Sequence, residues 1–220
     1  MNIKAINFDF YGTLFNWLQI WKDVSQVILK EHNVKISPQD FANEWRTTQR
    51  KLIEDKEFIK YKECITSALD MLCQKYEMKN QNYEKILFSK WKEIKPFPEV
   101  PNVLKKLKEK YVLAVCSNSS RDLFNVSAKK LPVKFDYVLI SDETKATKPH
   151  RKMYEIAVKA LGFNHKNILH IASSQMDVRG ATNAGLNVCW INRLNEKKLP
   201  ETPKPRFEIK KLDEVFEFLK

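Results

Sequence analysis

The sequence predicts an α/β fold, in which a Rossmann-like parallel sheet carries a helical bundle inserted after its first strand. Short, almost continuously apolar segments alternate with helical segments in residues 96–220, as is typical of strands buried on both faces. Helical spacing dominates instead between residues 16 and 95. The chain length of 220 residues suits one core domain that carries a smaller insertion.

The first strand is expected at residues 4–8, KAINF, whose residues are β-branched or aromatic. Four helical segments follow: WLQIWKDVSQVILKEH, PQDFANEWRTTQRKLIED, FIKYKECITSALDMLCQKY and YEKILFSKWKEI. Ser37 before Pro38 indicates a helix N-cap with proline at the first helical position. We therefore assign residues 16–95 to a helical cap domain and residues 1–15 and 96–220 to the core.

The segment KPFPEVP contains three prolines that are not expected inside a helix, and it marks the return to the core. The later strands are predicted at residues 112–116, 137–140, 167–172 and 187–191. Helices are predicted at residues 102–110, 121–130 and 152–161, around RGATNAG, and at 212–219. Gly162 is the expected C-cap of the third of these helices.

Composition argues against several classes of partner. The formal net charge is +12, but lysines mostly alternate with glutamates, which favours a solvated surface over a nucleic-acid site. No run of about 18 apolar residues is present, so no membrane span is expected. The early charge at Asp9 argues against a secretory signal, and the four cysteines show no zinc or disulfide spacing. We expect a cytoplasmic protein without a cofactor.

Polar side chains follow the predicted strands. Asp9 follows the first, Ser117 and Asn118 the second, and residues 173–177 the fourth, while Lys148 lies in the connection after the third. In a parallel sheet the carboxyl ends of the strands meet at one edge, where ligands bind. These side chains are therefore the candidate site.

In the four motifs that contain these residues, the chain resembles the haloacid dehalogenase superfamily. The first motif of that family matches FDFYGTLF with Asp9, and the second matches VCSNSS with Ser117. The third matches TKPHRKMYE with Lys148, and the fourth matches SSQMDVRGATNAG with Asp177. The motifs come in the family's order, and residues 16–95 stand where a family cap domain stands.

The closest resemblance is to the L-2-haloacid dehalogenases. Like them, this chain has Tyr11 where phosphatases of the superfamily carry a second Asp, and Asn118 after the second-motif Ser. Trp45-Arg46 matches their cap-helix pair, and WINR at 190–193 is similar to the end of their fifth strand.

The tyrosine is consistent with this subclass on physical grounds. A phosphatase expels a poor alkoxide leaving group and needs a general acid, and Mg²⁺ offsets the repulsion between its carboxylate and the phosphate. A halide leaves without a proton, so a dehalogenase needs neither the general acid nor the Mg²⁺ ion. The first acidic position of the fourth motif is also Ala172, which leaves Asp9 and Asp177 as a poor ligand set for Mg²⁺. We expect no bound metal.

The resemblance implies a role for each candidate residue. Asp9 would attack the halogen-bearing carbon of a short L-2-haloalkanoic acid and form an ester, which water would hydrolyse. Lys148 would keep Asp9 ionised, and Asp177 would orient Lys148 or activate the water. The resemblance also implies that Ser117 and Asn118 belong to the catalytic residues. The implied residues for substrate binding are Tyr11, which walls the pocket, Arg46, Ser117, Asn118, Ser173 and Ser174. Arg46 would pair with the substrate carboxylate or receive the halide.

Several alternatives stay open. Ser174, Met176 and Thr47 differ from the residues usual in the dehalogenases, so the pocket wall is altered. The chain could instead be a Mg²⁺-dependent phosphatase for a small phosphorylated metabolite, or a non-catalytic binding protein. Arg46 could be a solvated helix residue, and Asp177 a helix cap. The oligomeric state stays open, with a homodimer through the cap helices as one possibility.

Overall fold

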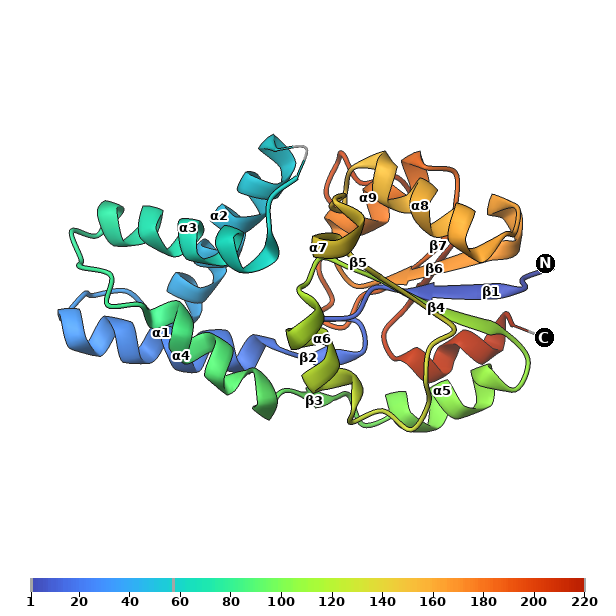
Figure 1. Ribbon diagram of the computed structural model, residues 1–220, viewed down its shortest axis with the longest axis horizontal. Helices are drawn as coiled ribbons and strands as arrows, with labels where there is room; N and C mark the ends of the chain where they lie inside the picture. Colours follow the sequence, from blue (N-terminus) through green and yellow to red (C-terminus); the bar gives the residue numbers. More distant parts are fainter. Residues whose placement is uncertain (1, 57, 220) are drawn as a thin grey trace.

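The computed structural model of the protein describes residues 2–56 and 58–219. Its main sheet has six parallel strands beside a layer of helices at one end (Figure 1). In spatial order the strands are β5 (Tyr137–Ile140), β4 (Val112–Ser117), β1 (Ala5–Phe8), β6 (Ile168–Ala172), β7 (Asn187–Ile191) and β8 (Phe207–Ile209). The predicted α/β fold with a parallel sheet is confirmed.

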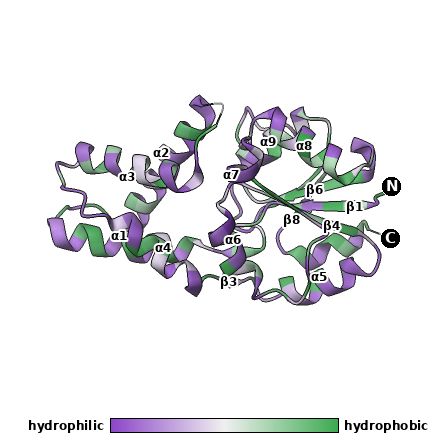
Figure 2. Ribbon diagram, viewed as in Figure 1, coloured by the Kyte–Doolittle hydropathy of each residue, from purple (hydrophilic) through white to green (hydrophobic). Residues whose placement is uncertain are grey.

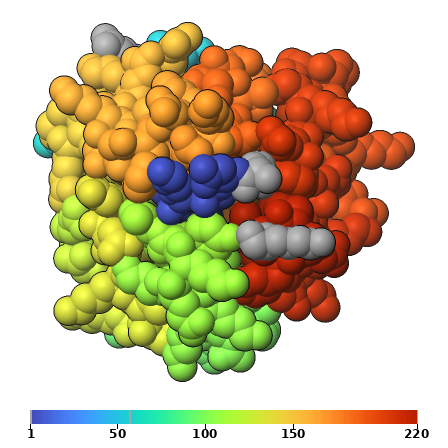
Figure 3. Space-filling view, turned by 90° about the vertical axis from the view of Figure 1, so that its right-hand side faces the viewer, coloured from blue at the N-terminus to red at the C-terminus, as the bar shows by residue number. Residues whose placement is uncertain are grey.

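The first strand lies in the middle of this sheet. In register, Phe8 of β1 stands beside Val115 of β4 on one side and Ile171 of β6 on the other. The chain leaves β1 toward β4 and later returns to β6, so the strand order reverses at β1. A crevice outside the carboxyl ends of the strands is expected at such a point. Figure 3 looks onto the opposite end of the sheet, where the N-terminal residues lie between later segments of the chain.

Successive side chains of β1 face opposite sides of the sheet, as a strand requires. Phe8 belongs to the large apolar cluster that includes Leu104 and Leu107, from a helix on one face of the sheet. Ala5 belongs to a second cluster, with Leu161 and Ala181 from two helices on the other face of the sheet. The apolar strands stand out in Figure 2. Burial on both faces explains their almost continuous apolar character.

The helices of the core cover both faces of the sheet (Figure 1). They are α5 (Val100–Lys108), α6 (Arg121–Ala128), α7 (Ser141–Thr144), α8 (Arg151–Leu161) and α9 (Gln175–Asn183). The 3₁₀ segments are η1 (Trp91–Glu93), η2 (His165–Asn167) and η3 (Leu212–Glu217). Helix α8 ends on Gly162, which has a left-handed backbone as predicted.

The segment between β1 and α5 is mainly helical, as the spacing predicts. It contains α1 (Leu18–His32), α2 (Pro38–Asp55), α3 (Tyr61–Lys75) and α4 (Tyr83–Lys90). The Ser37 hydroxyl accepts the backbone N–H of Asp40, so the predicted N-cap of α2 is confirmed. The division into domains at residues 15/16 and 95/96 stays an interpretation.

A short antiparallel pair lies at the two ends of this segment. Its strands are β2 (Phe15–Asn16) and β3 (Lys95–Pro96), which the sequence pattern did not predict. Two-residue strands carry no periodic signal, and their pairing depends on residues about 80 positions apart. The pair brings the chain entering and leaving the helical segment side by side.

Further differences between the sequence expectations and the structure lie at the C-terminal end and in α5. The C-terminal helix predicted at 212–219 is the 3₁₀ segment η3, and the short strand β8 was missed. One apolar face of six residues fits a 3₁₀ turn as well as an α-helix. Pro101 lies in the first turn of α5, where its missing N–H breaks no helical hydrogen bond. Within the described ranges, each helix is too short or too polar to cross a membrane.

Candidate active site

The carboxyl ends of the central strands carry a buried pair of carboxylates with one ammonium between them. Lys148 Nζ donates to Asp9 Oδ1 over 2.6 Å and to Asp177 Oδ2 over 2.5 Å. Lys148 is 3% exposed and Asp177 2%. Burial alone would lower the pKa of Lys148, but Asp177 and Asp9 outweigh it and raise that pKa. Lys148 therefore stays charged and holds the adjacent Asp9 carboxylate in place.

Asp9 is held at its second oxygen by the turn that follows β1. Thr13 Oγ1 donates to Asp9 Oδ2 over 3.0 Å and accepts the backbone N–H of Ser173 over 2.9 Å. Gly12 permits this turn, because its φ is +89° and an added Cβ would lie 2.8 Å from Ser173 Oγ. The carboxylate thus has a fixed orientation at the floor of a cavity. Thr13 was not among the predicted site residues, although it belongs to the Gly-Thr-Leu of the first motif.

Asn118 supports Lys148 from the neighbouring strand end. Its Nδ2 donates to the Lys148 carbonyl and its Oδ1 accepts the Lys148 backbone N–H, both over 2.8 Å. Such a two-point bond fixes the backbone from which the ammonium extends. Asn118 therefore positions the backbone of Lys148. The neighbouring Ser117 is buried and lines the cavity.

Asp177 is supported by a second layer of buried residues. Its Oδ1 interacts with His170 Nε2 at 2.9 Å and accepts the Tyr154 hydroxyl over 2.7 Å. His170 Nδ1 lies 3.1 Å from Asn7 Nδ2, so both ring nitrogens of this buried histidine have a polar partner. Sequence reasoning missed its contact with Asp177. The one available signal was a polar residue inside an otherwise apolar strand.

Tyr11 turns its hydroxyl away from Asp9. The hydroxyl donates to the Leu123 carbonyl over 2.9 Å, lies 3.1 Å from Ser127 Oγ and accepts Trp91 Nε1 over 2.7 Å. Burial raises the pKa of Tyr11 to about 12. Its ring lines the cavity while its proton is engaged elsewhere, so Tyr11 provides a wall and no acid.

Two adjoining spaces, which share lining residues, lie near the carboxyl ends of the central strands. The inner chamber, of about 80 Å³, is lined on the core side by Asp9, Ser117, Asn118, Lys148 and Asp177. The outer chamber, of about 570 Å³, lies between α2 and residues 191–202 and is lined by Arg46 and Ser173 among others. The residues that line both chambers are Tyr11, Trp17, Arg50, Ser174 and Met176. The predicted site residues thus divide between two adjoining spaces.

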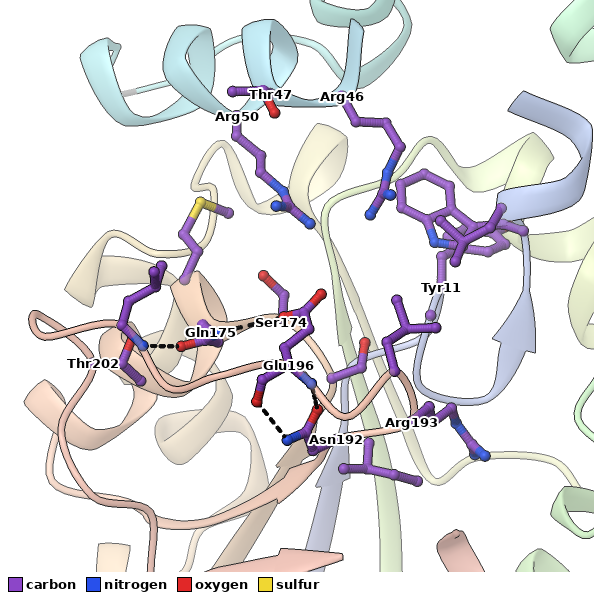
Figure 4. Close-up of a pocket in the computed structure, with 18 of the residues that line it drawn as sticks. Tyr11, Arg46, Thr47, Arg50, Ser174, Gln175, Asn192, Arg193, Glu196 and Thr202 are labelled. Atoms are coloured by element: carbon purple, nitrogen blue, oxygen red, sulfur yellow. Dashed lines mark hydrogen bonds between the residues drawn. The ribbon is translucent and has the colours of Figure 1, made fainter. Parts of the chain in front are cut away.

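Helix α2 supplies cap residues that sequence reasoning missed. Gln49 and Arg50 line the inner chamber, as does Tyr61 from the start of α3. In Figure 4, Arg46 and Arg50 both extend from α2 toward the cavity. Their spacing of four residues places them on one helical face, and this spacing was the signal that could have identified Arg50.

The donor set does not suit a divalent metal. Lys148 already occupies the position between the two carboxylates, and Ala172 supplies no ligand at the end of β6. In the part of the chain that the structure describes, no cluster of three or more His, Cys, Asp or Glu side chains could hold a metal ion. A hard cation such as Mg²⁺ requires several oxygen ligands.

Comparison with known proteins agrees with this geometry. The model of the haloacid dehalogenase-like hydrolase family matches residues 6–191. The haloacetate dehalogenase H-2 of Moraxella sp. (strain B) is 31% identical over 200 residues, which cover 87% of this chain and 86% of that protein. The (S)-2-haloacid dehalogenase of Pseudomonas sp. (strain YL) is 30% identical over 226 residues, covering 98% and 94%.

A solved structure shares the fold. The L-2-haloacid dehalogenase from Xanthobacter autotrophicus, with chloropropionic acid covalently bound, superposes with a TM-score of 0.81 over 97% of this chain and 96% of that one, at 19% identity. The buried Asp9–Lys148–Asp177 cluster, the parallel sheet and the match over residues 6–191 lead to one conclusion: this chain belongs to the haloacid dehalogenase-like hydrolase family.

Proposed function

We propose that this chain is a hydrolytic dehalogenase that replaces halide by hydroxyl on short L-2-haloalkanoic acids through an ester on Asp9. The observation that carries the proposal is the Asp9 carboxylate, hydrogen-bonded by Lys148 and Thr13 at the floor of a small chamber. A carboxylate held by an ammonium and a hydroxyl in this way is oriented for nucleophilic attack.

The first step forms a carbon–oxygen bond. An Asp9 oxygen attacks the carbon that carries the halogen, from the side opposite the halogen, and the carbon–halogen bond breaks with its electron pair on the leaving halide. The configuration at carbon inverts. No proton donor is needed for the halide, which agrees with a Tyr11 hydroxyl bonded to Leu123, Ser127 and Trp91.

The second step releases the product. Water adds to the carbonyl carbon of the Asp9 ester, and the bond between that carbon and the substrate oxygen breaks. The products are a 2-hydroxy acid, whose hydroxyl oxygen comes from Asp9, and a proton that passes to solvent. Asp177 is 2% exposed and its oxygens bond Lys148, His170 and Tyr154. These contacts support orientation of Lys148 as its role rather than activation of water.

The inner chamber supports a small carboxylic acid as substrate. Ser117, at the end of β4, lines the inner chamber together with Asp9, where the carboxylate next to the reacting carbon would bind. Arginine side chains from α2 add positive charge on the cap side. A volume of about 80 Å³ favours acids with few carbons.

A magnesium-dependent phosphatase is less well supported. It would need an acid where Tyr11 stands and metal ligands where Lys148 bonds both carboxylates. A non-catalytic binding protein would not need the three donors that surround Asp177. Both alternatives differ from the proposal in a measurable way.

The test is halide release from a panel of 2-halocarboxylates, including both enantiomers of 2-chloropropionate, in the presence of a chelator. Asp9→Asn should release no halide. A single turnover in ¹⁸O-labelled water should place the label in Asp9, detected by peptide mass spectrometry. A native protein that cleaves p-nitrophenyl phosphate only with Mg²⁺ and releases no halide would contradict the proposal.

A further inference from the structure

Two arginines of α2 face the cavity without a carboxylate partner. Arg46 and Arg50 extend side by side toward it (Figure 4), Arg46 into the outer chamber and Arg50 at the boundary of the two. Over residues 2–56 and 58–219, neither forms a hydrogen bond or an ion pair with another side chain. Arg193, which lines the same outer chamber, is instead paired with Glu99 over 2.7 Å.

Arg46 is the more enclosed of the two. Its guanidinium lies 5.3 Å from the Trp17 ring, and its Nε is buried without an acceptor. Burial, together with the smaller effect of the nearby Arg50, lowers the pKa of Arg46 to about 10. Like charges four residues apart on a helix are destabilising, and a buried donor without a partner adds to the cost. Both features are relieved when an anion binds between the two side chains.

Three acidic side chains line the outer chamber, namely Glu54, Glu196 and Glu201, and Glu54 is paired with Arg179. Glu196 lines the outer chamber, and its Oε2 accepts Gln175 Nε2 over 3.3 Å. In the described part of the chain it is not within ion-pair distance of Arg46 or Arg50. Among the described residues, none of these three carboxylates forms an ion pair with Arg46 or Arg50, so both guanidinium groups remain available to an anion.

The position of the pair relative to Asp9 indicates which part of a substrate it would meet. The carboxylate and the halogen of a 2-halo acid are both bonded to the carbon that Asp9 attacks, and Asp9 lines only the inner chamber. Arg46 lines only the outer chamber. A group that bonds both arginines must therefore lie farther along the substrate than the reacting centre.

We propose that the preferred substrate is a dianionic 2-halo acid, a 2-halodicarboxylate, whose second carboxylate binds between Arg46 and Arg50. Arginine suits this role because its planar fork bonds carboxylates through two N–H groups. The inference rests on the proposed function for the covalent chemistry at Asp9. With 2-chlorosuccinate, Asp9 displaces chloride, water hydrolyses the ester, and the products are 2-hydroxysuccinate, chloride and a proton.

The test compares substrates that differ in the second charge. Chloride release is measured with 2-chlorosuccinate, with its 4-methyl ester, which has the same carbon skeleton but one carboxylate, and with 2-chlorobutanoate. We expect kcat/KM for 2-chlorosuccinate to exceed that for the ester by about tenfold or more, as for a charge-assisted hydrogen bond. A native protein that handles the ester equally well or better overturns the inference.

Variants locate the effect. Arg50→Met and Arg46→Met should each reduce the preference for the dianion about tenfold, mainly through KM, while Arg50→Lys should retain part of it. Lys85→Met removes the same charge from an exposed position on α4 and should leave the preference unchanged. An undiminished preference in both arginine variants would overturn the inference.

The outcomes separate this inference from the proposed function. Halide release from 2-chloropropionate, without preference for 2-chlorosuccinate, leaves the proposed function intact and rejects the dianion. If no compound releases halide, the proposed function fails, and calorimetric titration with succinate and monomethyl succinate decides the inference alone. Tighter binding of succinate that is lost in Arg50→Met supports the dianion site, and equal or absent binding rejects it.

Discussion

Lys148 Nζ donates to Asp9 Oδ1 over 2.6 Å, although 139 residues separate the two in the sequence. Lys148 comes from the loop before α8, and Asp9 from the end of the central strand. The same ammonium bonds Asp177, so a single buried cation balances two carboxylates. The site therefore depends on this residue for both charge and geometry.

Lys148→Met should reduce halide release by about 100-fold or more, because Asp9 loses the group that orients it and faces Asp177 without a counter-charge. The rate is measured at saturating substrate, with circular dichroism as a check on folding. Lys159→Met, an exposed lysine on α8, is the matched control and should keep the native rate. A Lys148→Met protein that is folded and fully active would contradict the role of the ammonium.

Thr13→Val should lower kcat about tenfold, since the isosteric side chain cannot donate to Asp9 Oδ2 or accept the N–H of Ser173. Thr13→Ser keeps the hydroxyl and should stay close to the native rate. Steady-state halide release by the three proteins measures the effect. A Thr13→Val protein that keeps the native rate would contradict the role of the two Thr13 hydrogen bonds.

Stability should fall in acid because of Asp177. Burial alone would raise the pKa of Asp177, but Lys148 and His170 outweigh it and hold that pKa below its ordinary value. A carboxyl with a lowered folded-state pKa contributes stability above its unfolded pKa of about 3.9, and the contribution is lost as pH falls toward the folded value.

Urea unfolding between about pH 2 and pH 6 measures this linkage through the free energy of unfolding. The native protein should lose stability steadily below about pH 4. Asp177→Asn should be less stable at neutral pH and show a shallower acid slope, because the titrating group is gone. Identical slopes in the two proteins would assign the acid loss to other carboxylates.

Gly12→Ala should both destabilise the protein and lower its activity. The φ of Gly12 is +89°, which costs an alanine about 1–2 kcal/mol, and the added Cβ would lie 2.8 Å from Ser173 Oγ. Gly162→Ala is the control, because its φ is +70° but nothing lies within 4 Å of the added Cβ. Thermal unfolding and halide release are compared. Gly162→Ala should lose stability but keep its activity. If it is as inactive as Gly12→Ala, the close approach to Ser173 is not the cause of the lost activity.

Much of the fold follows from local pattern. The apolar segments that became β1, β4, β5, β6 and β7 lie within one or two residues of their predicted positions. Burial on both faces of a parallel sheet leaves a nearly continuous apolar run, which is visible without knowledge of the partner strands. The short strands β2, β3 and β8 have too few residues to carry a period.

Part of the candidate site was also predictable from the sequence. Asp9, Ser117 and Asp177 could be named because the carboxyl ends of parallel strands meet at one edge, and Lys148 from its motif. The sequence could not predict the direction of the Tyr11 hydroxyl or the contact of His170 with Asp177. The spacing from Arg46 indicates the helix face of Arg50 but not that Arg50 lines both chambers.

By itself, the sequence determined the alternation of strands and helices, the residues at the strand ends and the membership of a family of hydrolases. The tertiary structure alone decided which side chains meet above Asp9 and which atoms they present. The physical reason is the range of each interaction. Strand and helix periods depend on near neighbours, whereas the bond from Lys148 to Asp9 and the approach of Arg50 to the cavity require the whole chain to be folded.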